Sequence, residues 1–271
     1  MARLTEFGGA ADESIDLAEA ALLLASLDHP DPRLEDCRRR LAEIGADLAG
    51  TAAGRGDRRL GARASALREV LVERHGFLGD REHYDDLENA NLISVLERRR
   101  GLPVALAIIY IDAARRLDWP VQGLNFPGRF LIRLAAEDGG AVLDPFDGGE
   151  MRDAASLREL IKQGVGPDAE LMPEHFAAVD NRGILLRLEN NIKVRLLQAG
   201  ELEKAAAILE RMLLIAPGEP LLWLEAGAHY AQLGKLKSAV DAVERCRRLA
   251  PEQALRQRAE ALLGELRARL N

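Results

Sequence analysis

The fold is decided by two neighbouring stretches, LERRRGLPVALAIIYIDAARRLDWPVQGLNFPGRFLIR (residues 96–133) and AVLDPFDGG (residues 141–149). In the first, an apolar run from Leu102 to Ile111 follows directly after Gly101, which is typical of a buried helix that begins near Pro103. From Val121 the pattern changes to short β-rich runs, VQGLNF, FLIRL and AVLDPF, which are separated by a Pro-Gly turn and by the turn AAEDGG. This order predicts a central helix followed by a small sheet.

The central helix is apolar on nearly all sides between Val104 and Ile111, so it has to be covered by the sheet on one face and by other helices elsewhere. The sequence before it supplies such helices. An apolar stripe with a period near 3.6 runs from Ile15 to Leu24, and a second amphipathic helix is expected from about Leu34 to Leu48. These patterns predict an α+β domain in which helices pack against a small antiparallel sheet.

The same stretch closely resembles the transglutaminase-like domain of the SirB1 family, and residues 98–101 match that family's RRRG sequence. The resemblance implies a papain-like core of a helix and an antiparallel sheet. It also implies where a catalytic triad would lie. In active transglutaminase-like enzymes the nucleophilic Cys stands two residues after a Gly at the start of the central helix, a His follows in the next strand, and an Asp precedes a Pro at the end of the strand after that. These positions fall on Pro103, Arg129 and Asp144.

Only Asp144 keeps the residue type that the triad requires. Acyl transfer by a thiol needs a thiolate, an imidazole that relays the proton and a third group that orients the imidazole. Pro103 has no nucleophilic atom, and its neighbours Leu102, Val104 and Ala105 are no better. Arg129 stays protonated at every accessible pH and cannot act as a general base. We interpret the site as a degenerate triad without catalytic residues.

Each of these residues also has a local structural interpretation. Proline is favoured in the first turn of a helix, so Pro103 is expected to start the central helix. Asp144 is expected to cap a turn with Pro145, because Asx side chains bond the nearby backbone. For Arg129 two interpretations stay open, a solvated turn residue or a binding residue that offers a fixed fork to an anion. The residues named as candidate ligand contacts are Arg129, Asn125 and Asp144.

The basic run from Arg98 to Arg100 is interpreted as a set of cations in the last turn of a helix that Gly101 ends. The net charge of -7 over 271 residues argues against a nucleic-acid surface. Two isolated cysteines, Cys37 and Cys246, fit a reduced cytoplasmic protein, and no apolar run approaches the roughly 20 residues that span a membrane. No metal or other cofactor is expected, because His75 and His83 do not have the spacing of a compact zinc site.

The C-terminal part carries an independent signal with a period of 34 residues, since Gly200, Ala205 and Pro217 recur as Gly234, Ala239 and Pro251. This is the period of tetratricopeptide repeats. The second copy fits well, whereas the first has Lys193 where a small residue is usual. A helix from Gln253 to Leu270 is expected to cap the array. We predict two domains, a helical region with the transglutaminase-like domain in residues 1–180 and tetratricopeptide-like repeats in residues 181–271.

Two classes of function follow. The first is a non-catalytic protein, a pseudoenzyme that binds another protein, a peptide or a small ligand through the former active-site cleft or through the repeat tail. In this class the tail either binds the partner or only buttresses the first domain. The second class is an acyl-transfer enzyme or cysteine peptidase with a displaced nucleophile, for which Cys37 is the thiol candidate outside the tail. The resemblance and the degenerate triad favour the first class.

Overall fold

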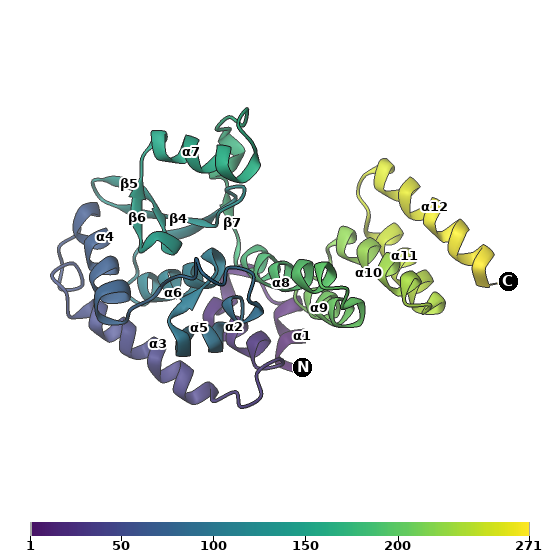
Figure 1. Ribbon diagram of the computed structural model, residues 1–271, viewed down its shortest axis with the longest axis horizontal. Helices are drawn as coiled ribbons and strands as arrows, with labels where there is room; N and C mark the ends of the chain where they lie inside the picture. Colours follow the sequence, from purple (N-terminus) through teal and green to yellow (C-terminus); the bar gives the residue numbers. More distant parts are fainter. Residues whose placement is uncertain (1, 271) are drawn as a thin grey trace. The chain divides into compact units, whose positions relative to one another are not determined.

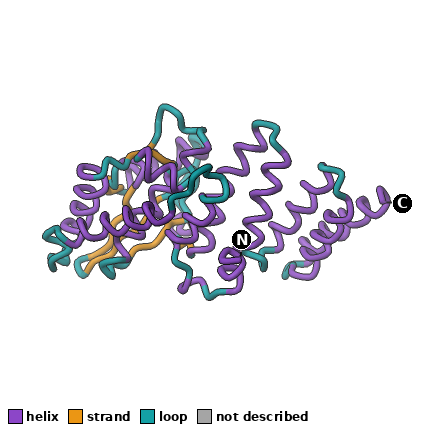
Figure 2. The backbone as a smooth tube through the Cα atoms, turned by 90° about the horizontal axis from the view of Figure 1, so that it is seen from below, coloured by secondary structure: helices purple, strands orange, loops and turns teal. Residues whose placement is uncertain are grey.

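The structure is a computed structural model, and it describes residues 2–270. The contacts divide the chain into two compact units. The first unit comprises residues 12–185, and the second comprises the chain from Leu186 onwards together with the segment that precedes Asp12. All strands of the described residues belong to the first unit, as the orange segments in Figure 2 show. The domain bounds at residues 1–180 and 181–271 stay a prediction about which parts fold independently.

The first unit contains a five-stranded sheet in which every neighbouring pair is antiparallel, as predicted. The strand order is β6 (Glu150–Arg152), β5 (Gly139–Asp144), β4 (Leu131–Ala136), β3 (Val121–Leu124) and β7 (Ala178–Val179). The three central strands coincide with the predicted β-rich runs. The two edge strands are too short to show a pattern in the sequence.

The central helix α6 (Pro103–Arg115) lies between the sheet and a layer of helices. It contacts β3 and β4 on one side, and on the other it contacts α2 (Leu17–Ala25), α3 (Leu34–Ala49) and α5 (Leu92–Arg98). Eleven of its residues are buried. The prediction that the sheet covers one face of this helix and other helices cover the rest is therefore confirmed. Figure 1 shows α7 (Ala154–Val165) on the opposite side of the sheet, where Leu157 and Ile161 pack against residues of β3, β4 and the loop between them.

Shorter elements complete the first unit. Two of them, β1 (Leu78–Gly79) and β2 (Arg100–Gly101), form a separate parallel pair. The others are α4 (Leu60–Arg68), the π-helical turn η2 (Glu69–Arg74), and the short 3₁₀ turns η1 (Asp12–Ser14), η3 (Leu87–Asn89), η4 (Pro145–Asp147) and η5 (Pro173–Phe176).

The segment between α5 and α6 differs in part from the prediction. Pro103 lies in the first turn of α6, as expected. The helix α5, however, ends at Arg98, and Arg99 adopts the left-handed conformation with φ of 61°. Gly101 is therefore not the helix stop. It lies in β2, and a Cβ atom there would come within 2.8 Å of a Val95 methyl group. Close packing, rather than the helix end, requires this glycine.

Helix α8 (Asn181–Gln198) is capped from the far end of the sequence. The two carboxylate oxygens of Asp12 accept the backbone N–H groups of Asn181 and Arg182, each at 2.9 Å. In turn, the Asn181 side-chain amide donates a hydrogen bond to the backbone carbonyl of Asp12 at 3.0 Å. The first N–H groups of a helix have no partner within the helix, and the helix dipole favours a negative charge there. Asp12 thus fixes the start of α8.

The second unit is built from helices only among the described residues. These are α1 (Ala2–Gly9), the later part of α8, α9 (Leu202–Ile215), α10 (Pro220–Gln232), α11 (Leu236–Leu249) and α12 (Gln253–Leu270). Gly200 and Gly234, which are 34 residues apart, both adopt the left-handed conformation, with φ of 76° and 73°. The 34-residue period is therefore visible in the conformation of the turns between helices. The last helix, α12, has the bounds that were predicted for the capping helix. No helix within residues 2–270 is both long and apolar enough to cross a membrane.

Candidate functional site

The structure brings Arg129 and Asp144 together. Asp144 ends β5, and its side chain is fully buried. Arg129 lies between β3 and β4, directly after Gly128, whose φ of +74° forms the tight turn. The Arg129 Nε atom lies 3.8 Å from the Asp144 Oδ2 atom. A permanent cation therefore pairs with the carboxylate at the place where the resemblance puts an imidazole.

Arg129 is mostly buried, with 18% of its side chain exposed, so it is not a solvated turn residue. Its guanidinium lies over the ring of Phe146, 4.6 Å from the ring centroid, which is a favourable cation–π distance. The Nη1 atom is 3.9 Å from an Asp147 carboxylate oxygen, too far for a hydrogen bond. This buried atom has no hydrogen-bond partner among the described residues. This donor is therefore enclosed by the protein and does not face the solvent.

Arg129, Asp144, Phe146 and Asp147 form a cluster with two more arginines, Arg152 and Arg81, which were not predicted from the sequence. Arg152 of β6 donates from Nη2 to Asp144 Oδ2 at 3.0 Å and also bonds Asp147. Arg81 bonds Asp147, and its guanidinium lies 5.6 Å from the centroid of Phe146. Arg152 lies in a strand of three residues and Arg81 in a loop, so neither shows a periodic signal. Their roles come from tertiary contacts alone.

Burial dominates the electrostatics of Asp144. Loss of solvent raises the pKa of this carboxyl above its usual value, although Arg129 and Arg152 both act to lower it. The Asp144 Oδ1 atom also accepts the backbone N–H of Phe146 at 3.1 Å, which confirms the predicted turn cap before Pro145. Asp144 is therefore a structural carboxylate that holds η4 in place.

The start of α6 belongs to the same region. Gly101, two residues before Pro103, pairs with Gly79 across the β1–β2 ladder. Gly79 in turn packs on Phe146, because a Cβ atom at Gly79 would come within 2.5 Å of the ring. Pro103 is buried in the first turn of α6. Asn125 is the residue after β3, and it is exposed. Its backbone N–H donates to the Ala177 carbonyl at 2.9 Å.

A hollow of about 690 Å³ opens beside this cluster. Phe146 and Asp147 line it from the cluster side, and charged residues of both signs line the rest, among them Asp80, Arg98 and Arg100. Arg98 is paired with Asp80 and Asp86 at 3.4 and 3.1 Å. Arg100 donates to the backbone carbonyls of Gly76 and Arg99, and it has no carboxylate partner among the described residues. The walls fit a polar or charged ligand group better than an apolar one.

Comparison with known families agrees with this architecture. The model of the transglutaminase-like superfamily matches residues 35–190, which contain the sheet, α6 and the Arg129–Asp144 pair. A tetratricopeptide-repeat model matches residues 192–264, which contain α9 to α11 and most of α12.

Individual proteins are also similar to this chain. A UPF0162 protein of Xylella fastidiosa is 32% identical over 254 residues, which are 89% of this chain and 86% of that protein. Protein SirB1 of Salmonella typhimurium is 31% identical over 159 residues, 58% of this chain and 59% of SirB1. The chain belongs to the SirB1 family. A further SirB1-family relative, the UPF0162 protein YchA of Escherichia coli K12, is 30% identical over the same share of both chains.

The two thiols of this SirB1-family chain are not activated. Cys37 is buried in α3, and burial raises the pKa of its thiol, which Glu97 and Asp36 raise further. Cys246 is buried in α11, where loss of solvent likewise raises the pKa. Reactive cysteines instead lie in electropositive and partly exposed surroundings that lower the pKa. Within residues 2–270, no three His, Cys, Asp or Glu side chains are arranged to hold a metal ion.

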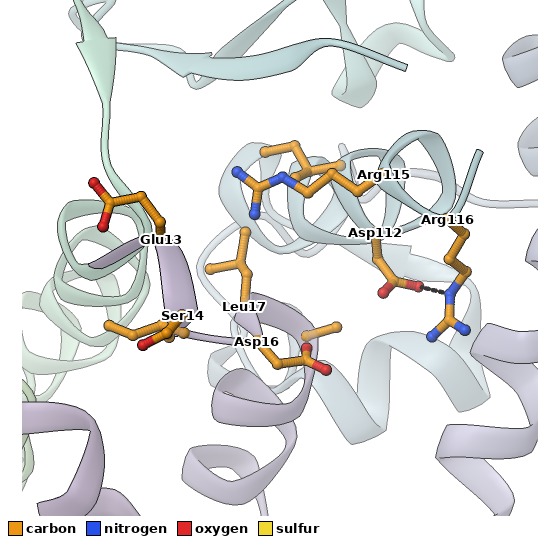
Figure 3. Close-up of a pocket in the computed structure, with 10 residues that line it drawn as sticks. Glu13, Ser14, Asp16, Leu17, Asp112, Arg115 and Arg116 are labelled. Carbon is orange, nitrogen blue, oxygen red and sulfur yellow. Dashed lines mark hydrogen bonds and ion pairs between the residues drawn. The ribbon is translucent and has the colours of Figure 1, made fainter. Parts of the chain in front are cut away.

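A second hollow, of about 410 Å³, lies at the opposite end of α6 (Figure 3). Asp112 and Arg116 form an ion pair on its wall, with Arg116 Nε 2.7 Å from Asp112 Oδ2. Arg115 donates to the Asn181 side chain at 2.8 Å and so supports the start of α8. This hollow contains none of the predicted site residues.

Proposed function

We propose that this member of the SirB1 family is a non-catalytic binding protein, in which the former active site and the repeat tail serve recognition. The observation that carries the proposal is the Arg129–Asp144 ion pair. An imidazole at this position would exchange a proton at neutral pH, whereas a guanidinium holds its proton. With Pro103 at the start of α6, the two positions at which the resemblance puts the nucleophile and the base hold neither group.

The hollow beside the cluster supports a binding role. It is large enough to hold several residues of a peptide or a small molecule, and ligand pockets typically measure about 300–1,000 Å³. The Arg100 guanidinium lines the hollow, and among the described residues no carboxylate neutralises it by a hydrogen bond. We therefore place a partner segment with a carboxylate or another anionic group in this hollow, as an arginine fork favours.

The repeat tail supports a protein partner in particular, because tetratricopeptide arrays offer extended surfaces for binding. We place the protein in the cytoplasm, where its two free and buried cysteines remain reduced. Neither a nucleic acid nor a membrane fits the net charge of -7 and the charge pattern of the chain. The alternative, acyl transfer by Cys37, is disfavoured because burial raises the pKa of that thiol.

Thiol labelling tests the absence of catalysis. In the native protein we expect iodoacetamide and activated acyl probes at neutral pH to label Cys37 and Cys246 at least about 100-fold more slowly than in urea, because labelling has to await local opening. The labelled residue is identified by mass spectrometry, and Cys37→Ala provides the control. Rapid labelling of native Cys37 that is selective for acyl probes would establish the enzyme alternative instead.

Charge reversal on the wall of the hollow tests the binding role. Arg100→Glu changes a residue that lines the hollow, and Arg99→Glu changes the exposed neighbour that does not. In affinity capture followed by quantitative mass spectrometry, we expect the wild type and Arg99→Glu to retain a common partner that Arg100→Glu loses by at least tenfold. Equal capture by all three chains would remove the hollow from the proposal and leave the tail as the binding surface.

A further inference from the structure

The two repeats differ in how deeply their second helices are buried. Helices α9 and α11 both have 14 residues and are related by the 34-residue period. Seven residues of α9 are buried, but only four of α11. The four buried residues of α11, at positions 239, 242, 243 and 246, correspond to buried residues of α9 at 205, 208, 209 and 212. These corresponding residues form the core that both repeats share.

The additional buried residues of α9 are Ala206, Leu213 and Ile215. Ala206 and Leu213 are seven residues apart and form a second apolar face, whereas Ile215 lies seven residues after Ile208 on the core side of the helix. One period after Ala206 and Leu213 the chain has Val240, which is half-buried, and Arg247, which is exposed. Leu213 of the first repeat is buried, and its counterpart in the second repeat, Arg247, is exposed. This difference indicates that α9 is covered on a side where α11 faces solvent.

The N-terminal helix α1 packs against α9 and belongs to the same unit (Figure 1). Leu4 is buried, with 2% of its surface exposed. One turn later, Gly8 approaches the end of α9 so closely that a Cβ atom there would lie 2.2 Å from the Leu214 carbonyl oxygen and 3.1 Å from Pro217. Residues at positions i and i+4 share one face of a helix, so Leu4 and Gly8 form one docking face.

The helix α1 depends on this docking. It has eight residues, whereas isolated helices shorter than about 12–15 residues are marginal in water. The array depends on it as well, because two repeats are fewer than the three or more that such arrays usually need, and terminal repeats require a cap. At the other end α12 supplies a cap through Leu255, Ala259 and Leu263.

We propose that the second apolar face of α9 is a helix-docking surface whose occupant is residues 2–9 of the same chain. This helix acts as an intramolecular strap that covers α9 in place of a further repeat. The surface selects a short helix with a large apolar residue and, four residues later, a glycine. The inference is independent of the hollow in the first unit and of whether that hollow binds a partner.

Two adjacent glycines allow a matched test in the full-length chain. A Cβ atom at Gly8 meets the backbone of α9, whereas a Cβ atom at Gly9 meets nothing within 4 Å. Both substitutions to alanine raise the helix propensity of α1 by the same amount. We therefore expect Gly8→Ala to increase hydrogen exchange of the α9 amides at least tenfold, and Gly9→Ala to leave that exchange unchanged or lower it. The amides of α6 serve as the internal reference.

Leu4→Ala provides a second variant, because it removes the buried side chain without creating a clash. We expect it to raise α9 exchange in the same direction as Gly8→Ala. A chain without residues 1–11 should show the same increase, and a synthetic peptide of these residues should reverse it in a concentration-dependent way. Unchanged α9 exchange in Gly8→Ala, Leu4→Ala and the truncated chain would overturn the proposal.

Discussion

Replacing Arg152 with methionine should lower the free energy of unfolding of the first unit by about 3 kcal/mol at pH 7, since it removes the cation that bonds the buried Asp144 carboxylate and leaves only the more distant Arg129. Arg152 is 12% exposed and bonds the fully buried Asp144, as well as Asp147. Trp119 is buried in this unit and Trp223 lies in the other. Urea unfolding followed by fluorescence in a Trp223→Phe background therefore reports on the first unit alone.

The pH dependence of this effect has a defined sign. Burial already raises the pKa of Asp144, and removing Arg152 removes one of the groups that lower it. A carboxyl group with a raised pKa in the folded state holds its proton longer than in the unfolded chain. Below the usual pKa of 3.8 the carboxyl is protonated in both states, and the folded state carries no buried negative charge. As the pH rises from 3.8 through the pKa of the folded state, the buried carboxyl ionises and this stability is lost. The cost of Arg152→Met should grow from pH 4 to pH 7.

The matched control is Arg158→Met in α7. Arg158 is exposed and bonds only a backbone carbonyl one turn earlier. Its replacement should change the free energy of unfolding by less than about 0.5 kcal/mol. Adding Asp144→Asn to Arg152→Met should recover part of the loss at pH 7, because position 144 then no longer carries a buried negative charge. Equal effects of the two arginine variants would show that the cluster does not support the fold.

In the repeat unit, Glu225→Ala should lower the free energy of unfolding by about 3 kcal/mol, because it removes the carboxylate that bonds the buried ammonium group of Lys193. Lys193 is 4% exposed, and its Nζ atom lies 2.6 and 2.7 Å from the two carboxylate oxygens of Glu225. The measurement is urea unfolding followed by Trp223 fluorescence in a Trp119→Phe background. Glu203→Ala, at an exposed position of α9, should change the result by less than about 0.5 kcal/mol.

A second substitution separates the loss of the ion pair from the loss of packing. Lys193→Met keeps the volume of the side chain and removes its charge, and buried ion pairs replaced by apolar residues are often as stable as the originals. The double variant Lys193→Met, Glu225→Ala should therefore regain most of the stability that Glu225→Ala loses. If the double variant were as unstable as Glu225→Ala, the cost would lie in packing and not in the unpaired charge.

Much of the fold follows from local patterns in the sequence. The helix that starts at Pro103, the three central strands and the 34-residue repeat were all predicted, because each extends over enough residues to show a period or a turn signal. The edge strands β6 and β7 and the β1–β2 pair escaped prediction, since each has only two or three residues. The cap that Asp12 places on α8 has no local signal either, because its partners lie 169 and 170 residues away.

The candidate site was predicted less completely. The resemblance named Arg129 and Asp144, and the structure brings them together. Arg81, Arg152 and the ring of Phe146 complete the cluster through contacts that depend on the folded sheet. Lys193 was noticed as an unusual residue at a position for small side chains, but its explanation, Glu225, lies 32 residues later in the next repeat. Ion pairs of this kind are properties of tertiary structure.

The docking of α1 and the cap from Asp12 also set an order of events on the ribosome. Asp12 is made 169 residues before Asn181, and the partners of α1 in α9 are made later still. At synthesis rates of about 5–20 residues per second, Asp12 waits roughly 8–34 s for its partner Asn181 to be made. During that time the strands and α6 emerge and have their own partners available. Asp12 and α1 thus reach their folded positions later than the sheet that is made after them.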